Sequence, residues 1–508
     1  MVAYTSLNHS ESALPISAGA DSGSSTGGAS SSYRPHKTRG SPLRSVFASL
    51  HALVKRARQR WITTLVAFFL LIVVLNAIFG QGASVSSTVT GLAYKLRPAA
   101  WRRPNEYAGE GLKTVASSNE WVKGSGRPSL NYDTPFNRDD LTLTEDECDA
   151  FFPGLWKDIE RSVDYYTQHP FTKEYLERSC DDNEFSQLRV VVFNNRLYIK
   201  MYKQSDFTRT QTTLALLHQA IMSSRELLPN VEFCMDLQDW GHPGKFSLDR
   251  SPDQQDVWLM PDYGWYSWKE HVGAYKEFRE ASERVENEIG WSGKKDKLFW
   301  RGSMRVGRAD REALVAAASG HHWSDVQPLD WTGDRHEWVS MADHCRWKFH
   351  GFPEGNSYSG RLRYLQNCRS VIVTHEPRWI QHWTHLYNAN SSSPDQNIVF
   401  VPPPPPGTKG VPVRDNDDSP VRYDATWTRL PEVMDELLRD DAKAKRIADN
   451  QWTFFRERYI SPASAACYWR KALHGFAKTQ RYTVDLSGKE VSFEDHMLQN
   501  FPNFPPPS

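Results

Sequence analysis

The chain has 508 residues, and its 61 Lys and Arg balance its 61 Asp and Glu, so the formal net charge is zero. This length accommodates about three domains, and a hydrophobic fraction of 39% with 12% aromatic residues suffices for a large core. A zero net charge argues against a general polyanion binder and gives no electrostatic case for nucleic acid as a partner.

The first element predicted along the chain is a membrane-spanning helix at 61–79. Its sequence, WITTLVAFFLLIVVLNAIF, carries no charge and is close to the length that a bilayer requires. Several Lys and Arg residues precede this run, and no acidic residue lies between Asp21 and its start. After the run, the first Lys or Arg is Lys95. The positive-inside rule therefore predicts a single-pass type II protein with a large lumenal part. A cleaved signal peptide is the alternative, but a long segment precedes the apolar run.

Composition and periodicity divide the rest of the chain. The N-terminal segment is rich in Ser, Gly and Ala, which is typical of disorder. Beyond a stem of weak periodicity, strands and helices alternate, which favours α/β layers with largely parallel sheets. We expect two α/β halves facing a cleft. The expected organisation is a cytoplasmic tail at 1–60, the anchor at 61–79, a lumenal stem at 80–145, an N-terminal half at 146–290, a C-terminal half at 291–475 and a tail at 476–508.

Short apolar runs and helical spacings predict the individual elements. The run LRVVVFNNRLYIKMY predicts a β-hairpin around Asn194 and Asn195. The run TRTQTTLALLHQAIMSSRELL has the leucine spacing of a helix. Further strands are predicted at VEFCMDL (231–237), KLFW, SVIVT and NIVFVP, and further helices at RADREALVAAAS, at RLRYLQN and from Pro431 to about Tyr459. The run PPPPP (402–406) predicts a rigid surface connection.

Polar residues follow three of the predicted strands. In doubly wound sheets, ligands bind outside the carboxyl ends of the strands. These sets are therefore expected to converge on one cleft: Gln238-Asp239-Trp240, Arg301-Gly302-Ser303 and His375-Glu376. His375 and Glu376 are candidates for ribose or sugar contacts, and a buried histidine beside a surface acid is the alternative interpretation.

Two loops have the chemistry of phosphate binding. In KLFWRGSMRVGRADREAL, Gly302 allows close approach of a ligand, Ser303 offers a hydroxyl near a helix start, and Arg311 offers a fork of donors. The loop FPEGNSYSG, which ends at Arg361 and a helix start, suits a diphosphate in the same way. The alternative for both is an ordinary turn with a helix cap and surface salt bridges.

Four motifs in order resemble glycosyltransferase family 90, the family of capsule-associated xylosyltransferases and protein O-glucosyltransferases. They are FWRGS, DREAL, DHCRWKF and SGRLRYLQNCRSVIV, and the similarity runs from about Asp146 to the CYW at 467–469. The runs VWLMPDYGWYSW and THEPRWIQHW resemble the capsule-type branch more than the protein-glucosylating branch. The resemblance implies a GT-B fold, with two Rossmann-like halves, and inverting transfer of a sugar, xylose favoured, from a UDP-sugar.

The resemblance also implies roles for individual residues. Asp239 corresponds to the catalytic base, although Gln238 and Gly241 replace an arginine and a proline of the family's turn. The family arginine that opens the helix after FRGS corresponds to Arg311, but this chain has a short insertion before it. Arg305 or Arg308 could therefore take that role instead. The residues implied to bind the nucleotide-sugar are Arg301, Ser303, Arg311, Asn356, Ser357 and Arg361. No metal-binding DxD follows a buried strand, so we predict no essential cofactor and leave use of Mn²⁺ open.

The six cysteines all follow the predicted span, and an even number in a lumenal domain suggests disulfides. The family's disulfide pattern suggests Cys345–Cys368 and Cys148–Cys467, which leaves Cys180–Cys234. The chain also carries a glycosylation sequon at Asn390.

The expected protein is thus a Golgi membrane glycosyltransferase with a UDP-sugar donor, a glycan or glycoprotein acceptor and one N-terminal membrane helix. Three alternatives stay open. One is a protein O-glucosyltransferase that uses UDP-glucose, and a second is a non-catalytic lumenal protein that binds glycans. The third, a glycoside hydrolase, needs a pair of carboxylates, whereas the sequence offers one well-placed aspartate.

Overall fold

The structure is a computed structural model that describes residues 137–181, 187–202, 207–269, 271–329 and 338–499. All of these belong to one compact unit, Asn105–Ser508. The expected cytoplasmic tail, the membrane span at 61–79 and nearly all of the stem lie outside the described residues. Within the described ranges, no helix combines the length and the apolar character needed to cross a membrane.

The N-terminal half is built on a six-stranded sheet of order β15-β2-β1-β3-β4-β5. Its strands are β1 (Gln187–Phe193), β2 (Arg196–Tyr202), β3 (Val231–Asp236), β4 (Lys245–Ser247), β5 (Trp258–Leu259) and β15 (Val491–Ser492). The predicted hairpin is confirmed: Asn194 and Asn195 join β1 to β2 with φ of 48° and 55°, the left-handed conformation that Asn tolerates.

This N-terminal sheet is mixed rather than Rossmann-like throughout. Strand β1 pairs antiparallel with both β2 and β3, whereas β3, β4 and β5 pair in parallel. The β1–β2 pair is antiparallel because a two-residue turn can join only antiparallel strands.

Helices of distant chain segments cover this half. They are α3 (Glu145–Phe151), α4 (Lys157–Gln168), α5 (Lys173–Asp181), α6 (Phe207–Met222), α12 (Pro462–Thr479) and α13 (Phe493–Gln499). Helix α12 packs on α4 and α6, and β15 pairs with β2. The end of the chain therefore returns to the N-terminal half, which differs from the expected boundary at 475 and tail at 476–508. Helix α12 is buried on nearly every face, so its pattern does not indicate which half it joins.

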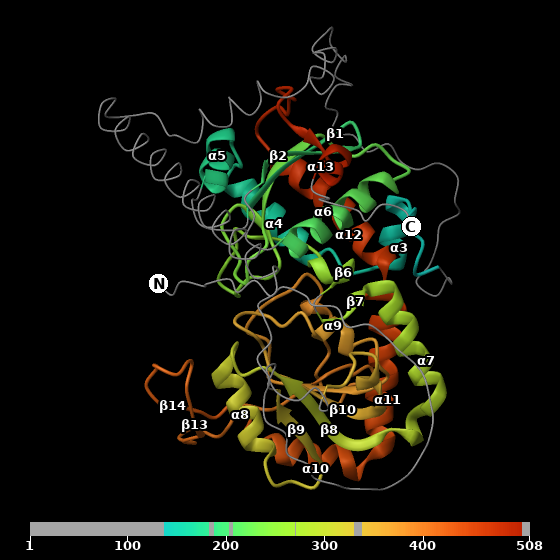
Figure 1. The fold of residues 1–508 in the computed structure, drawn as a ribbon, viewed down its shortest axis with the longest axis vertical. Helices are drawn as coiled ribbons and strands as arrows, with labels where there is room; N and C mark the ends of the chain where they lie inside the picture. Colours follow the sequence, from blue (N-terminus) through green and yellow to red (C-terminus); the bar gives the residue numbers. More distant parts are fainter. Residues whose placement is uncertain (1–136, 182–186, 203–206, 270, 330–337, 500–508) are drawn as a thin grey trace, which may run out of the picture. The chain divides into compact units, whose positions relative to one another are not determined.

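The C-terminal half has a five-stranded, fully parallel sheet of order β12-β11-β10-β8-β9. Its strands are β8 (Lys295–Gly302), β9 (Ser324–Pro328), β10 (Trp347–Phe352), β11 (Val371–Thr374) and β12 (Val399–Phe400). Counted along the chain, this order is 2-1-3-4-5, a doubly wound topology whose switch point lies between the first and third strands. Figure 1 shows these two strands, β8 and β10, with α8 (Arg308–Ala318) nearby.

The helix predicted from Pro431 to Tyr459 is divided into three segments, α10 (Leu430–Arg439), α11 (Asp441–Gln451) and the π-helical η6 (Trp452–Tyr459). The first break lies at Asp440, whose carboxylate accepts a hydrogen bond from the Lys443 amide at 2.9 Å. This is an N-cap, which begins a new helix. The remaining elements are η2 (Tyr263–Trp265), β6 (Ser267–Trp268), β7 (Gly273–Ala274), α7 (Tyr275–Gly293), η4 (Asp343–Arg346), α9 (Leu362–Leu365), η5 (Thr384–Leu386), β13 (Val411–Val413) and β14 (Arg422–Asp424).

All three expected disulfides are present: Cys148–Cys467, Cys180–Cys234 and Cys345–Cys368. The first joins α3 to α12 across 319 positions of the chain. A cross-link of this kind typically stabilises a fold by about 2–4 kcal/mol. It fixes the returning C-terminal helix to the start of the N-terminal half.

Candidate functional site

Asp239 lies in the turn that follows β3, a strand whose six residues are all buried. Its Oδ1 accepts a hydrogen bond at 2.9 Å from Arg209 Nη1 of α6, and its carboxylate is 31% exposed. The Arg209 guanidinium also stacks 4.9 Å from the ring of Tyr263. Burial alone would lower the pKa of Arg209, but electrostatic interactions with Tyr263 and Asp239 raise it. The site therefore holds a firmly charged arginine against one oxygen of a reachable carboxylate.

Asn356, in the loop after β10, connects this turn to the C-terminal sheet. Its Nδ2 lies 3.4 Å from Asp239 Oδ2, and its Oδ1 accepts a hydrogen bond at 3.3 Å from the Gly307 amide. Gly307 precedes α8, which follows β8. One side chain thus joins the ends of β3, β8 and β10. The first two are strand ends that the sequence pattern predicted, whereas the third predicted set, at His375 and Glu376, follows β11.

Gly307 sets how closely the two loops of the C-terminal half approach each other. It has a φ of +54°, and a Cβ added there would lie 2.5 Å from the carbonyl oxygen of Gly355. A side chain at this position would therefore be strained and would also push the loop after β10 away. The contact places the start of α8 beside the 354–357 backbone, at the switch point of the sheet.

Two arginines meet at this switch point, Arg311, which is buried, and Arg361, which is half-buried. Arg311 of α8 donates to the carbonyl oxygens of Ser303 at 2.5 Å and Glu354 at 3.2 Å, and Arg361 donates to the carbonyl oxygen of Arg301. Burial lowers the pKa of Arg311 to about 10, and burial with the nearby charge of Arg311 lowers that of Arg361 to about 9. Both guanidinium groups stay protonated at neutral pH.

Arg311 and Arg361 meet backbone carbonyls, and within the described part of the chain neither guanidinium has a carboxylate at ion-pair distance. Two like charges that burial destabilises favour the arrival of an anion. Ser303 stands beside them at the end of β8, and its Oγ accepts from the Arg305 amide at 3.0 Å. The serine proton is thus left to donate to a ligand.

The other arginines of this region are engaged differently. Arg301 donates to Asp325 of β9 at 2.6 Å and covers the ring of Phe299, so its side chain fastens two strands together. Arg308 pairs with Glu312 at 2.7 Å, and Arg305 is exposed. The geometry therefore favours Arg311 over Arg305 and Arg308 as the anion-binding residue, and assigns to Arg301 a structural contact that the sequence did not predict.

His375, at the end of β11, belongs to a buried cluster behind the anion site. Its Nε2 lies 3.1 Å from Asp310 Oδ2, and its Nδ1 lies 2.7 Å from the Glu376 carbonyl oxygen. Burial alone would lower the pKa of His375, but the hydrogen bond and charge of Asp310 raise it. The same Asp310 accepts from the Glu354 amide at 2.9 Å. The cluster thus anchors the loop after β10, which fits the buried-histidine interpretation, and Glu376 is exposed.

Ser357 is fully buried, and its hydroxyl donates at 2.7 Å to Oδ2 of Asp249, which follows β4. Sequence reasoning missed Asp249, and it also missed Arg209 and Asp310. Arg209 and Asp249 lie outside the quoted motifs, whereas Asp310 opens DREAL, but each of the three meets its partner across a long chain separation. A buried strand followed by Asp is the only local signal, and both Asp239 and Asp249 carry it.

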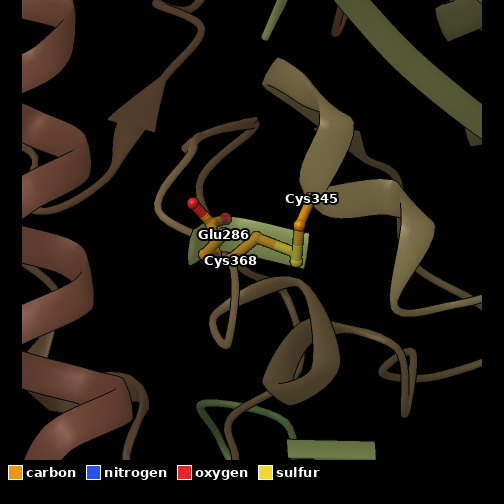
Figure 2. A group of neighbouring side chains, drawn as sticks. All are labelled: Glu286, Cys345 and Cys368. Atoms are coloured by element: carbon orange, nitrogen blue, oxygen red, sulfur yellow. A yellow bond between two sulfur atoms is a disulfide. The ribbon is translucent and has the colours of Figure 1, made fainter. Parts of the chain in front are cut away.

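Figure 2 shows Glu286 beside the Cys345–Cys368 disulfide. Their potential ligand atoms lie within 4.8 Å of one another, but the two sulfur atoms are bonded together. Glu286 Oε1 accepts from Lys294 Nζ at 2.6 Å and from the Arg369 amide at 2.8 Å. The group therefore pins α7 to the C-terminal sheet through a disulfide and a buried ion pair.

A separate groove of about 480 Å³ lies between α8 and the β13–β14 hairpin. It is lined by Met304, Val315, Pro412 and Val421 among others, and neither Arg311 nor Asp239 contributes to it. Of its charged members, Arg308 binds Glu312 and Asp417, and Arg414 donates to the carbonyl oxygen of Ser419 at 2.6 Å. The groove is thus distinct from the candidate site.

Fold and site together define an α/β protein whose C-terminal sheet is doubly wound, with a candidate anion site at the switch point and a carboxylate connected to it through Asn356. Residues 144–391 match the family described as Glycosyl transferase family 90. The chain carries a glycosyltransferase family 90 domain, as its ordered motifs indicate.

Relatives with curated names agree with this family. The chain is 24% identical over 407 residues to an O-glucosyltransferase rumi homolog of Anopheles gambiae. This alignment covers 72% of this chain and 89% of that protein. It is 23% identical to a rumi homolog of Aedes aegypti, and the alignment covers 51% of this chain and 63% of that protein. Protein O-glucosyltransferase 1 of Homo sapiens is 20% identical over 51% of this chain and 64% of its own length. Two of these three alignments thus span less than two thirds of the relative's own length.

Proposed function

We propose that this protein is an inverting glycosyltransferase that moves a sugar from a UDP-sugar to a hydroxyl group of a glycan acceptor. One observation carries the proposal. The buried Arg311 and the half-buried Arg361, which have no carboxylate partner among the described residues, lie at the switch point of a doubly wound sheet, and Asn356 connects that place to Asp239. Nucleotide phosphates bind at such points, and the family domain supports the same chemistry.

The donor side is assigned to the C-terminal half. Arg311, Arg361 and the hydroxyl of Ser303 would bind the diphosphate, with the amides at the start of α8 adding a positive field. As the bond between the anomeric carbon and UDP breaks, negative charge grows on the departing diphosphate. Fixed cations in a water-poor site stabilise that charge more strongly in the transition state than in the ground state. A GT-B arrangement, with each half supplying one substrate side, is part of this proposal.

The acceptor side is assigned to Asp239. Its Oδ1 is held by Arg209 at 2.9 Å, while Oδ2 has the longer 3.4 Å contact with Asn356. The acceptor oxygen attacks the anomeric carbon on the face opposite UDP, and its proton passes to Oδ2. One carbon–oxygen bond forms, one breaks, UDP leaves with the electron pair, and the anomeric configuration inverts.

Xylose is the donor sugar that the capsule-type motifs favour. The printed names of the relatives are O-glucosyltransferases, which supports UDP-glucose and a protein acceptor as the second candidate. We also propose a type II anchor at 61–79 and residence in the Golgi membrane. No metal is assigned to the reaction, because arginine side chains and a helix start offer the diphosphate its positive charge.

The test is UDP release by the purified full-length chain with UDP-xylose, UDP-glucose and UDP-galactose, with and without EDTA. Release from UDP-xylose that Asp239→Asn reduces by about 10³-fold or more, with UDP affinity kept within about threefold, is expected. Asp253→Asn, an exposed aspartate of the same half, is the matched control. Release from UDP-glucose alone would move the protein to the glucosylating branch. Absence of both release and UDP binding by the wild type would contradict the proposal and favour a non-catalytic glycan-binding protein.

A further inference from the structure

We propose that Asp249 is a positioning residue which, as a neutral carboxylic acid, holds the base turn and the donor loop together. The inference rests on the proposed function, because it concerns the same site. It goes beyond that function by assigning a protonation state and a task to a residue that does not itself touch the substrates.

Asp249 contacts both parts of the site. Its Oδ2 accepts the hydroxyl of Ser357 at 2.7 Å, and Ser357 lies in the donor loop next to Asn356. Its backbone carbonyl oxygen lies 2.6 Å from the place where a Cβ of residue 241 would stand, so Gly241 is the residue that fits there. Gly241 ends the turn that carries Asp239. One fully buried residue thus supports both the catalytic turn and the diphosphate loop.

The base turn is further fixed from the same side. Gln254 Nε2 donates to the Gly241 carbonyl oxygen at 2.7 Å, while its Oε1 accepts from the Ser251 amide at 2.9 Å. The segment 249–254 is therefore a frame on which the turn rests. A change in the ionisation of Asp249 would therefore alter the positions of Asp239 and Ser357 together.

The surroundings of Asp249 favour its neutral form. Its side chain is completely buried, and within the described residues Oδ1 has no hydrogen-bond partner. Two further acids act on it electrostatically, Asp239 from the base turn and Glu354 from the donor loop. Burial raises the pKa of Asp249, the like charges of both acids raise it further, and the bonds from Ser357 and the Tyr358 amide only partly oppose this.

Arg250, the residue after Asp249, does not compensate a charge on Asp249, because its guanidinium donates to both carboxylate oxygens of Asp158 at 3.2 and 3.0 Å. A buried carboxylate without a cation is costly, so the proton stays on the acid. The neutral acid still accepts the Ser357 hydrogen bond, and it places no negative charge beneath the loop that would bind the diphosphate.

The experiment compares Asp249→Asn, Asp249→Ala and the exposed control Asp253→Asn in the full-length chain. UDP affinity is measured by calorimetry, and thermal unfolding is followed from pH 5 to pH 9. Asparagine has the shape of the neutral acid and carries no charge at any pH. We expect Asp249→Asn to bind UDP within about threefold of the wild type, and Asp249→Ala to bind it about tenfold more weakly, the typical effect of one lost buried hydrogen bond.

The pH arm has a defined sign. A carboxyl group whose pKa is higher in the folded than in the unfolded chain binds more protons when folded, so stability falls as the pH rises above the unfolded pKa, near 4. The wild type should therefore lose Tm toward alkaline pH relative to Asp249→Asn, whereas Asp253→Asn should follow the wild type. This arm needs no ligand.

The outcomes separate the inference from the proposed function. A loss of UDP affinity in Asp249→Asn as large as in Asp249→Ala would overturn the inference, because the charge would then be required. A wild-type Tm that runs parallel to that of Asp249→Asn from pH 5 to pH 9 would overturn it as well. If the wild type fails to bind UDP, the proposed function fails, and the pH dependence of unfolding still decides the state of Asp249. If Asp249→Ala does not fold, the asparagine variant decides alone.

Discussion

Asn356 Nδ2 lies 3.4 Å from Asp239 Oδ2, although 117 positions of the chain separate the two residues. This contact joins the N-terminal half, which supplies the candidate base, to the C-terminal half, which supplies the candidate anion site. The side-chain oxygen Oδ1 of Asn356 also accepts a hydrogen bond from the Gly307 backbone N–H at 3.3 Å. A neutral side chain with a donor at one end and an acceptor at the other is required to satisfy both neighbours.

Replacing this amide by a carboxylate should make catalysis sensitive to pH. In Asn356→Asp, a second acid faces Asp239 and favours its protonated form, so the base is active only at higher pH. We expect kcat/KM to fall by a larger factor at pH 6 than at pH 8, because the repulsion between two neighbouring carboxylates favours protonation most at the lower pH. The measurement is the pH profile of UDP release, with the exposed Asn416→Asp as the control. An equal loss at both pH values would contradict the contact's electrostatic role.

The two arginines at the switch point should lower the stability of the free protein and strengthen the binding of UDP. Burial and mutual repulsion destabilise the Arg361 cation in the free protein, as its lowered pKa of about 9 indicates. Arg361→Gln should therefore leave the Tm of the free chain unchanged or raised, while UDP affinity falls by about 10–100-fold, the effect of losing a charge-assisted hydrogen bond. Arg361→Lys should recover only part of that affinity, because lysine lacks the planar fork.

Thermal shift with and without UDP measures both quantities, since a ligand that binds only the folded state raises Tm according to its affinity. Arg305→Gln is the matched control, because Arg305 is exposed on the same turn. A lower Tm for free Arg361→Gln, together with an unchanged UDP-induced shift, would make Arg361 a structural residue instead.

Local signals in the sequence predicted the elements that short-range chemistry controls. The Asn-Asn turn specified its hairpin, and the apolar run at 231–237 specified a buried strand, because backbone conformation and burial there depend on adjacent residues. The sequence placed Asp239 and Ser303 at strand ends and Asn356 in a loop before a helix, and the topology then brought these positions together. The all-parallel sheet of the C-terminal half followed from the alternation of strands and helices.

Long-range contacts were beyond the reach of those signals. Arg209 meets Asp239 from 30 positions away, and Asp249 meets Ser357 from 108 positions away. Nothing in either local pattern differs from an ordinary surface arginine or a turn aspartate. The affiliation of α12 with the N-terminal half was missed for the same reason, since a helix apolar on all faces fits either core.

Two glycines of the C-terminal half provide the final prediction, because they share a backbone conformation and differ in their surroundings. Gly307 has φ +54° and a Cβ position 2.5 Å from the Gly355 carbonyl oxygen, whereas Gly320 has φ +79° and open space around it. Alanine in the left-handed region costs about 1 kcal/mol or more at either place. Only at residue 307 does the new methyl group also displace the donor loop.

Gly320→Ala should therefore lower the free energy of unfolding by about 1 kcal/mol and leave UDP affinity unchanged. Gly307→Ala should lower the free energy of unfolding by about 2 kcal/mol or more, since the strain and the clash add. It should also weaken UDP binding, because the start of α8 and the 354–357 loop must separate. Denaturant unfolding and calorimetry measure the two effects. Wild-type UDP affinity in Gly307→Ala would show that the close approach of these two loops does not form the anion site.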